Sequence, residues 1–252
     1  MDRRMPEASI YKKSPITEAV IDFRVELPDD VLLSTLATAN AGQEAEYPVG
    51  QELFSLGGEI SIGVSAAGMI SSTPIGYLFN SNDQKKIYQA RLNGFTFSRL
   101  APYELWEPFR DEARKLWEVY QGIARPQKIT RVAVRYINRL DLPLPLNDFK
   151  EYLKTLPEVA SDLPERALSG YFMQVQIPQI ELEGTLILTQ TIVPPPPHQP
   201  DVVSVLLDID LFREANLPEA ETACWGILEE LHTRADKVFE ACITERTKEL
   251  IR

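Results

Sequence analysis

The stretch ITEAVIDFRVEL, residues 16–27, alternates apolar and polar side chains with a period of two. This period places the apolar positions on one face of an extended chain and the polar positions on the other. The polar positions are Glu18, Asp22, Arg24 and Glu26. The stretch therefore predicts a β-strand with one buried face and one open face.

A second stretch, residues 129–142, has the same character and is rich in β-formers. Leu27-Pro28 follows the first strand and Leu142-Pro143 follows the second, and each pair predicts the start of a short helix. The first short helix is expected to reach about Ala39. The second is expected around Asn147–Leu156, with Asn147 as its N-cap.

Each short helix precedes a meander and then a long helix with an apolar stripe. The turn residues and strand formers predict short strands at residues 60–62, 76–79, 87–92, 171–177, 185–193 and 202–211. The long helices are expected at about 103–121 and 217–249, with Trp106 and Trp225 near their starts.

The order of elements thus repeats at an interval of about 115 residues. We predict an α+β fold of two similar β-α-β-meander-α modules, at 15–126 and 127–252, after a flexible N-terminal arm at 1–14. Such modules resemble the tandem units of the TATA-binding-protein fold and of helix-grip proteins. That likeness implies an antiparallel sheet with the long helices on one side. The alternative is that any α+β chain shows this coarse repetition.

Composition narrows the classes of partner and compartment. The net charge of -11 disfavours nucleic acid, because an acidic chain repels phosphates unless it segregates a basic patch. The N-terminus has no apolar core of a signal peptide, and no apolar run reaches the 18 residues of a membrane span. Cys224 and Cys242 are expected to be buried thiols in a reducing compartment. We expect a cytoplasmic protein with no membrane contact.

The most informative feature is a row of arginines on the second strand. Arg131, Arg135 and Arg139 share one face, and Asp22 belongs to an acidic row with the same spacing on the first strand. One interpretation is a ladder of ion pairs that fixes the register between the two strands. The other is an anion-recognising patch formed by these arginines with Arg24, since a guanidinium binds carboxylate or phosphate at two points.

Motifs of catalysis are missing from the sequence. It has no phosphate-binding glycine loop, no Gly-x-Ser-x-Gly elbow and no cluster of histidines and cysteines. We therefore expect no cofactor and no metal, and favour a non-catalytic binding or adaptor protein. Its partner would be a protein or a small anionic ligand, and a homo-oligomer is left open. The alternatives are an enzyme with an acid/base pocket between sheet and helix, or a nucleic-acid-binding saddle.

Four segments also carry a resemblance to a known family. They are residues 15–24, 103–106, 131–139 and 239–246. Together they resemble a sporadically distributed family of prokaryotic proteins of similar length that has no established activity. The resemblance spans nearly the whole chain and implies no catalytic residue.

Overall fold

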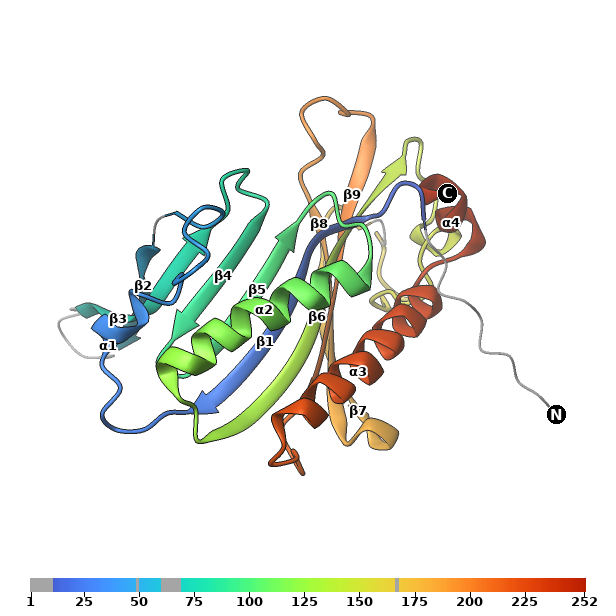
Figure 1. Ribbon diagram of the computed structural model, residues 1–252. Helices are drawn as coiled ribbons and strands as arrows, with labels where there is room; N and C mark the ends of the chain where they lie inside the picture. The colour runs from blue at the N-terminus through green and yellow to red at the C-terminus, as the bar shows by residue number, and fades with distance from the viewer. Residues whose placement is uncertain (1–10, 49, 60–68, 166–167) are drawn as a thin grey trace, which may run out of the picture.

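The computed structural model describes residues 11–48, 50–59, 69–165 and 168–252. In these residues the chain forms one nine-stranded sheet of order β2-β3-β4-β5-β1-β6-β9-β8-β7 (Figure 1). Every neighbouring pair is antiparallel. The strands are β1 (Ile16–Glu26), β2 (Gly50–Glu59), β3 (Met69–Asn80), β4 (Lys86–Arg91), β5 (Gly94–Leu100), β6 (Lys128–Pro143), β7 (Phe172–Gln179), β8 (Gly184–Val193) and β9 (Val202–Arg213).

The long helices lie on one face of this sheet. In Figure 1, α2 (Trp106–Ala124) and α3 (Glu221–Cys242) both lie in front of the strands. Helix α2 contacts β5, and α3 contacts β6 and β9. The shorter α1 (Leu33–Leu36) packs near α2, and α4 (Glu245–Ile251) follows α3. The expected α+β class, antiparallel sheet and one-sided helices are confirmed.

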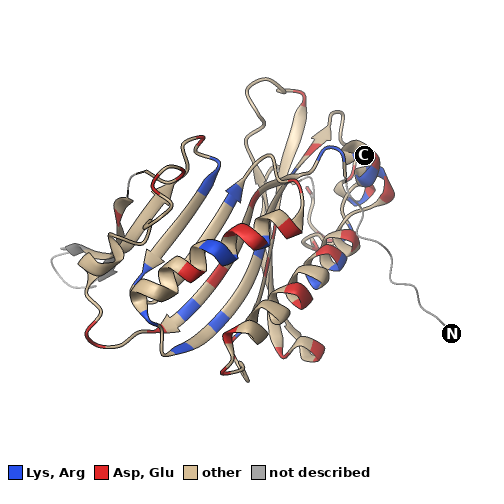
Figure 2. Cartoon of the chain, in the orientation of Figure 1, with Lys and Arg blue, Asp and Glu red and all other residues tan. Residues whose placement is uncertain are grey.

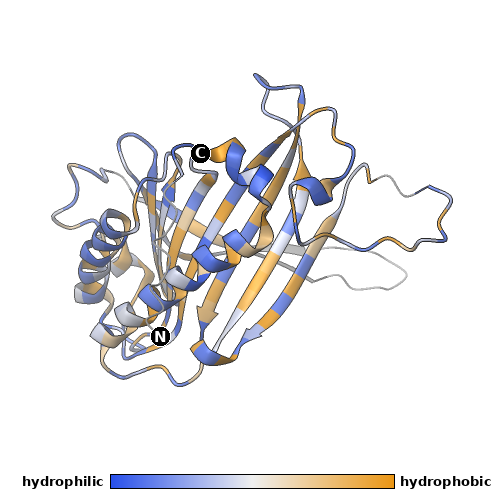
Figure 3. Ribbon diagram, turned by 90° about the vertical axis from the view of Figure 1, so that its right-hand side faces the viewer, coloured by the Kyte–Doolittle hydropathy of each residue, from blue (hydrophilic) through white to orange (hydrophobic). Residues whose placement is uncertain are grey.

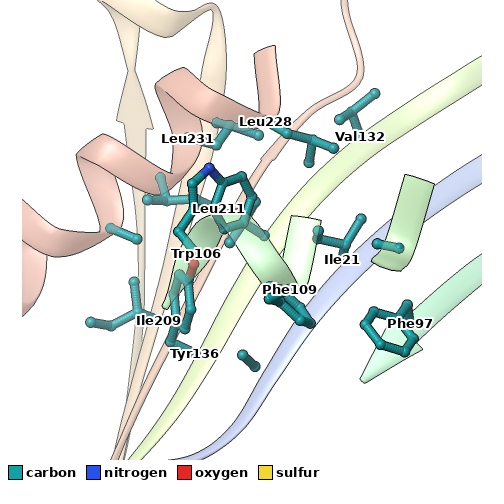
Figure 4. Close-up of a cluster of buried hydrophobic side chains, with 14 of the residues drawn as sticks. Ile21, Phe97, Trp106, Phe109, Val132, Tyr136, Ile209, Leu211, Leu228 and Leu231 are labelled. Carbon is teal, nitrogen blue, oxygen red and sulfur yellow. The ribbon is translucent and has the colours of Figure 1, made fainter. Parts of the chain in front are cut away.

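Aromatic side chains join both helices to the centre of the sheet. Phe23 on β1 stacks on Trp117 of α2, with ring centroids 4.5 Å apart, and lies 5.3 Å from Trp225 of α3. Figure 4 shows how Trp106, with Leu228 and other apolar side chains, fills the space between helices and strands. Burial of this apolar area is the main force that holds the helices on the sheet.

The two strands singled out in the sequence are neighbours at the centre of the sheet. β1 pairs with β6, and Asp22 lies opposite Ala133 while Arg24 lies opposite Arg131. Beyond β1 follow β5, β4, β3 and β2, and beyond β6 follow β9, β8 and β7. The sheet therefore has its first-half strands on one side of the β1–β6 pair and its second-half strands on the other.

The helix predictions need three corrections. The helix expected from Pro28 is only the four residues of α1, because Leu32 before it is extended. The helix expected at 147–156 is a 3₁₀ turn at Phe149–Glu151, and its cap is Asp148, which accepts from the Lys150 amide. The final helix is broken after Cys242, where Ile243 is extended and forms a bridge with Leu153.

The strand predictions were incomplete in the first half. β5 was missed as a separate strand. It begins only three residues after the end of β4, and its residues were assigned to the meander as a whole. β2 was also missed, because Gly57 and Gly58, a pair typical of turns, lie within the strand. The strand expected at 60–62 and residues 1–10 of the expected arm lie outside the described residues. The last part of the expected arm is bound to the C-terminal helix α4, since the Lys13 amide donates to the Ile251 carbonyl.

Candidate recognition surface on the open sheet face

Alternation along β1 decides which side chains face away from the helices. Ile21 and Phe23 are fully buried on the side of the helices. Because neighbouring residues of a strand point to opposite faces, Asp22 and Arg24 point away from the helices. In Figure 3 the strands that face the viewer change between hydrophobic and hydrophilic residues along their length. Figure 2 shows charged residues along the central strands. Those that alternate with buried apolar residues along a strand belong to this open face.

Asp22 is the centre of a network of charged groups on the open face. Its Oδ2 accepts from Arg91 Nη2 at 2.6 Å and from Thr96 Oγ1 at 2.7 Å. Its Oδ1 accepts from Arg131 Nη1 at 2.9 Å and from Arg24 Nε at 3.2 Å. Three arginines therefore share one carboxylate, which itself is buried.

The charge of Asp22 is held by these partners. Burial raises the pKa of the carboxyl, because the charged form loses water. Arg91, Thr96 and Arg24 outweigh that effect and hold the pKa of Asp22 below its ordinary value. Asp22 is therefore ionised at neutral pH and stabilises the arginines around it.

Arg131 links Asp22 to the second half of the sheet. Its Nη2 lies 3.3 Å from both carboxylate oxygens of Asp210 on β9, and its guanidinium lies 4.4 Å from the ring centroid of Phe212. Burial raises the pKa of Asp210, and Arg131 and Arg135 lower it without cancelling the rise. The pKa of Asp210 is therefore shifted in the direction opposite to that of Asp22.

The other two arginines of β6 pair with acids of the same half. Arg135 donates from Nε and Nη2 to the two oxygens of Asp208, at 2.8 and 2.6 Å, in a bidentate pair. Arg139 donates to Asp141 at 2.9 Å, to Ser204 at 2.8 Å and to the Pro194 carbonyl at 2.9 Å. The acidic and basic rows therefore meet across β1 and β6 at Asp22, whereas Arg135 and Arg139 pair elsewhere.

Exposure separates the arginines into two groups. The side chains of Arg135 and Arg24 are 45% and 40% exposed. Those of Arg139, Arg131 and Arg91 are 27%, 17% and 10% exposed. A partner that approaches the open face therefore meets Arg24 and Arg135 first, with the buried pairs beneath them.

All five residues predicted for the site, Asp22, Arg24, Arg131, Arg135 and Arg139, lie on this one face. Sequence reasoning did not include Arg91, Thr96, Asp208 and Asp210 among them. Apolar and polar residues alternate along β4 and β9, and this alternation puts Arg91, Asp208 and Asp210 on a polar face, so the sequence could have found them. Thr96 gave no signal, because the strand that carries it was not predicted.

A second polar cluster lies on the helix face and differs in character. The rings of Trp106 and His232 stack with centroids 4.3 Å apart, and the Tyr136 hydroxyl lies 2.9 Å from His232 Nδ1. Burial lowers the pKa of His232 to about 4, and burial raises the pKa of neighbouring Asp236 to about 6. Figure 4 shows Trp106 and Tyr136 within the core. His232 is therefore neutral at neutral pH, and burial makes Asp236 easier to protonate than an ordinary aspartate.

Two cavities on the described surface lie apart from His232 and Asp236, which line neither of them. The smaller, of about 170 Å³, lies beside the start of α2 and is lined by Phe97, Arg99, Tyr103 and Phe109 among others. The larger, of about 1050 Å³, is open and is formed by residues 146–159 with Leu168. Both lie away from the Asp22 network.

Two further properties bear on ligands. Within the described residues, no three histidine, cysteine or acidic side chains are grouped as metal ligands would be. None of the helices in the same part of the chain is both long and apolar enough to cross a membrane.

Comparison of the chain with protein-family models, with curated proteins and with solved structures found no match.

Proposed function

We propose that this chain is a non-catalytic binding protein that recognises an acidic segment of a partner protein through the open face of its sheet. Arg24 and Arg135 make the contacts in this proposal, and the carboxylates of Asp22 and Asp208 hold them in place. The proposal rests on charge, exposure and unused hydrogen-bond donors on this face.

The state of Arg24 carries the proposal. Its Nε donates to Asp22 at 3.2 Å, the longest of the four bonds to that carboxylate. Its two terminal nitrogens make no hydrogen bond to any described residue. A guanidinium offers five donors, and its planar fork matches a carboxylate. Arg24 therefore presents an open fork to a ligand on a half-exposed side chain.

The pairing of Arg24 favours an anion, although the whole chain is acidic. Three arginines converge on Asp22, and Arg131 has two further carboxylates near, that of Asp210 and that of Glu214, whose Oε1 lies 3.7 Å from its Nε. Among the described residues, Arg24 and Arg91 pair with no acid other than Asp22. A carboxylate from a partner would give Arg24 an acid of its own, which a cation would not.

The spacing of the two exposed arginines indicates a partner larger than a single small anion. Arg24 lies opposite Arg131, and Arg135 is four residues further along the same strand. At the rise of a strand this places the two Cα positions about 13 Å apart along β6. Two acidic side chains four residues apart in an extended segment would reach both arginines.

The proposed site also lies where the two halves of the chain meet. Asp22, Arg24 and Arg91 come from residues 15–126, and Arg131 and Arg135 come from residues 127–252. We interpret these halves as two modules related by duplication and joined at the β1–β6 pair. Recognition at this seam would require both modules. The buried, free Cys224 and Cys242 fit our placement of the protein in a reducing cytoplasm.

The test uses a fluorescent peptide with two glutamates four residues apart among threonine and valine. Wild type is expected to bind this peptide and not its glutamine counterpart. Arg24→Ala and Arg135→Ala, made separately, should each weaken binding by about tenfold, the effect of losing one charged hydrogen-bonding pair. Their melting temperatures should stay near that of wild type.

Arg114→Ala is the matched control, because Arg114 is 51% exposed on α2, on the helix face. It should leave peptide binding unchanged. If wild type binds citrate but not the peptide, the partner is a small anion and the protein-recognition proposal is wrong. If wild type binds neither, recognition by this face is refuted.

A further inference from the structure

The last strand of the sheet, β7, has an outer edge with no partner strand among the described residues. It pairs only with β8, from Phe172 opposite Thr191 to Gln179 opposite Gly184. An edge of this kind presents a row of backbone N–H and C=O groups that can pair with another strand. Figure 3 shows the molecule from the side on which this part of the sheet lies.

β7 lacks the features that protect sheet edges from pairing. Its sequence, FMQVQIPQ, has no charged residue, and its only proline, Pro178, stands near its end. Phe172 is 70% exposed and Ile180, just beyond the strand, is 87% exposed. Natural edges are usually blocked by lysines, prolines or bulges. The apolar, uncharged edge is thus open over residues 172–177.

The opposite edge of the sheet is different. β2 carries Glu52, which is exposed, and its pairing with β3 is shifted by an irregularity between Leu53 and Phe54. Charge and a bulge both oppose pairing with another strand. The contrast shows that one edge is protected in the usual way and the other is not.

We propose that β7 pairs antiparallel with β7 of a second copy of this chain, so that two sheets join into one. A second copy fits because an antiparallel pair of identical strands is self-complementary about a two-fold axis. It also fits the charge, since two chains of net charge -11 repel each other wherever their acidic surfaces meet. Self-association is therefore favoured at the uncharged edge.

A register centred on Val175 places side chains of the same kind opposite each other on each face of the joined sheet. Opposite residues of an antiparallel pair point to the same face of a sheet. With Val175 on the axis, Gln174 of one copy lies opposite Gln176 of the other, and Met173 lies opposite Ile177. Glutamine pairs then form on one face and apolar pairs on the other, and Pro178 remains at the end of the pairing.

The dimer would also affect recognition by the open face, although the dimer itself does not depend on the proposed function. A two-fold axis perpendicular to the sheet keeps both open faces on the same side. Two copies of the Arg24–Arg135 surface would then act together on a partner with two acidic segments, which raises its apparent affinity. The dimer itself forms whether or not that surface binds a partner.

Sedimentation velocity over a dilution series tests the proposal directly. Wild type is expected to shift from monomer to dimer with concentration. The double variant Gln174→Lys with Gln176→Lys should remain a monomer, because four lysines then meet across the axis. Both positions are exposed, so the fold should keep its melting temperature.

The matched control places two lysines on the other edge, at Gln51 and Ser55 of β2, which are also exposed. This variant should dimerise as wild type does. Hydrogen exchange of unmodified protein gives a second readout, in which the amides of 172–177 become more protected at high concentration and those of β2 do not. A wild type that stays monomeric, or a dimer broken only by the β2 variant, overturns the proposal.

Discussion

The two polar clusters of this molecule lie on opposite faces of the same central strands and keep their groups in opposite states. Around Asp22, arginines hold a buried carboxylate in its charged form. Around His232, burial without a close cation holds an imidazole and a carboxyl toward their neutral forms. Burial sets the state of the groups around His232, whereas opposite charges set the state of Asp22. The difference indicates that, of these two clusters, the one on the open face is suited to bind an ion.

The largest effect should come from breaking the charged cluster at its centre. Asp22→Asn leaves the three arginines without their shared charge, and loss of one partner of a buried ion pair costs about 3–5 kcal/mol of unfolding free energy. Urea unfolding at neutral pH measures this loss. Asp30→Asn is the control, because Asp30 pairs with Arg125 at an exposed site, and it should leave the midpoint unchanged. A loss at Asp22 below about 1 kcal/mol would mean that the network behaves as a surface pair.

The second effect is a pH dependence that belongs to the helix-face cluster. The pKa of His232 is lowered from 6.5 to about 4, so the stability due to its neutral form is present above pH 6.5 and is lost as pH falls through about 4. At 1.4 kcal/mol for each pKa unit, this loss is about 3 kcal/mol when complete.

Asp236 acts in the opposite direction over the same range. Its pKa is raised from 3.8 to about 6, so the folded state gains stability as pH falls from above 6 toward 3.8. The groups that face the pair are Glu229, Glu107 and Glu240. Wild type should therefore show a weak net dependence between pH 4 and 6.5.

Two variants separate these contributions. His232→Gln should become more stable as the solution is acidified from pH 6.5 to pH 4, and Asp236→Asn should become less stable. Thermal unfolding in a series of buffers measures both. Parallel pH profiles for the two variants would show that the groups do not titrate in opposite directions as we describe.

The smallest effect should come from one neutral hydrogen bond of the same cluster. Tyr136→Phe removes the hydroxyl that lies 2.9 Å from His232 Nδ1 and should cost about 1 kcal/mol of unfolding free energy. Its second consequence is that the imidazole loses its partner, so the pKa of His232, followed by NMR, should change. An unchanged pKa together with unchanged stability would exclude this bond as a part of the cluster.

The sequence was sufficient to predict those strands in which burial of one face imposes a strict alternation of apolar and polar residues. The alternation in β1 and β6 predicted both strands and their polar faces, including Asp22 and Arg131, which do form an ion pair. It was insufficient where a tertiary contact overrides a local pattern. The last helix was predicted to continue to about residue 249, but it ends at Cys242, where Ile243 is extended and forms a bridge with Leu153. Partners of the arginines depend on which strands are neighbours, and local periodicity does not contain that information.

The most direct test of recognition by the open face is NMR of the arginine side chains. Titration with the glutamate peptide should shift the Nε–Hε signals of Arg24 and Arg135 and leave that of Arg114 in place. Arg91, which is buried beneath them, should shift less than either. Shifts confined to Arg114 and the helix face, or no shift for Arg24 and Arg135 at saturating peptide, would contradict the account.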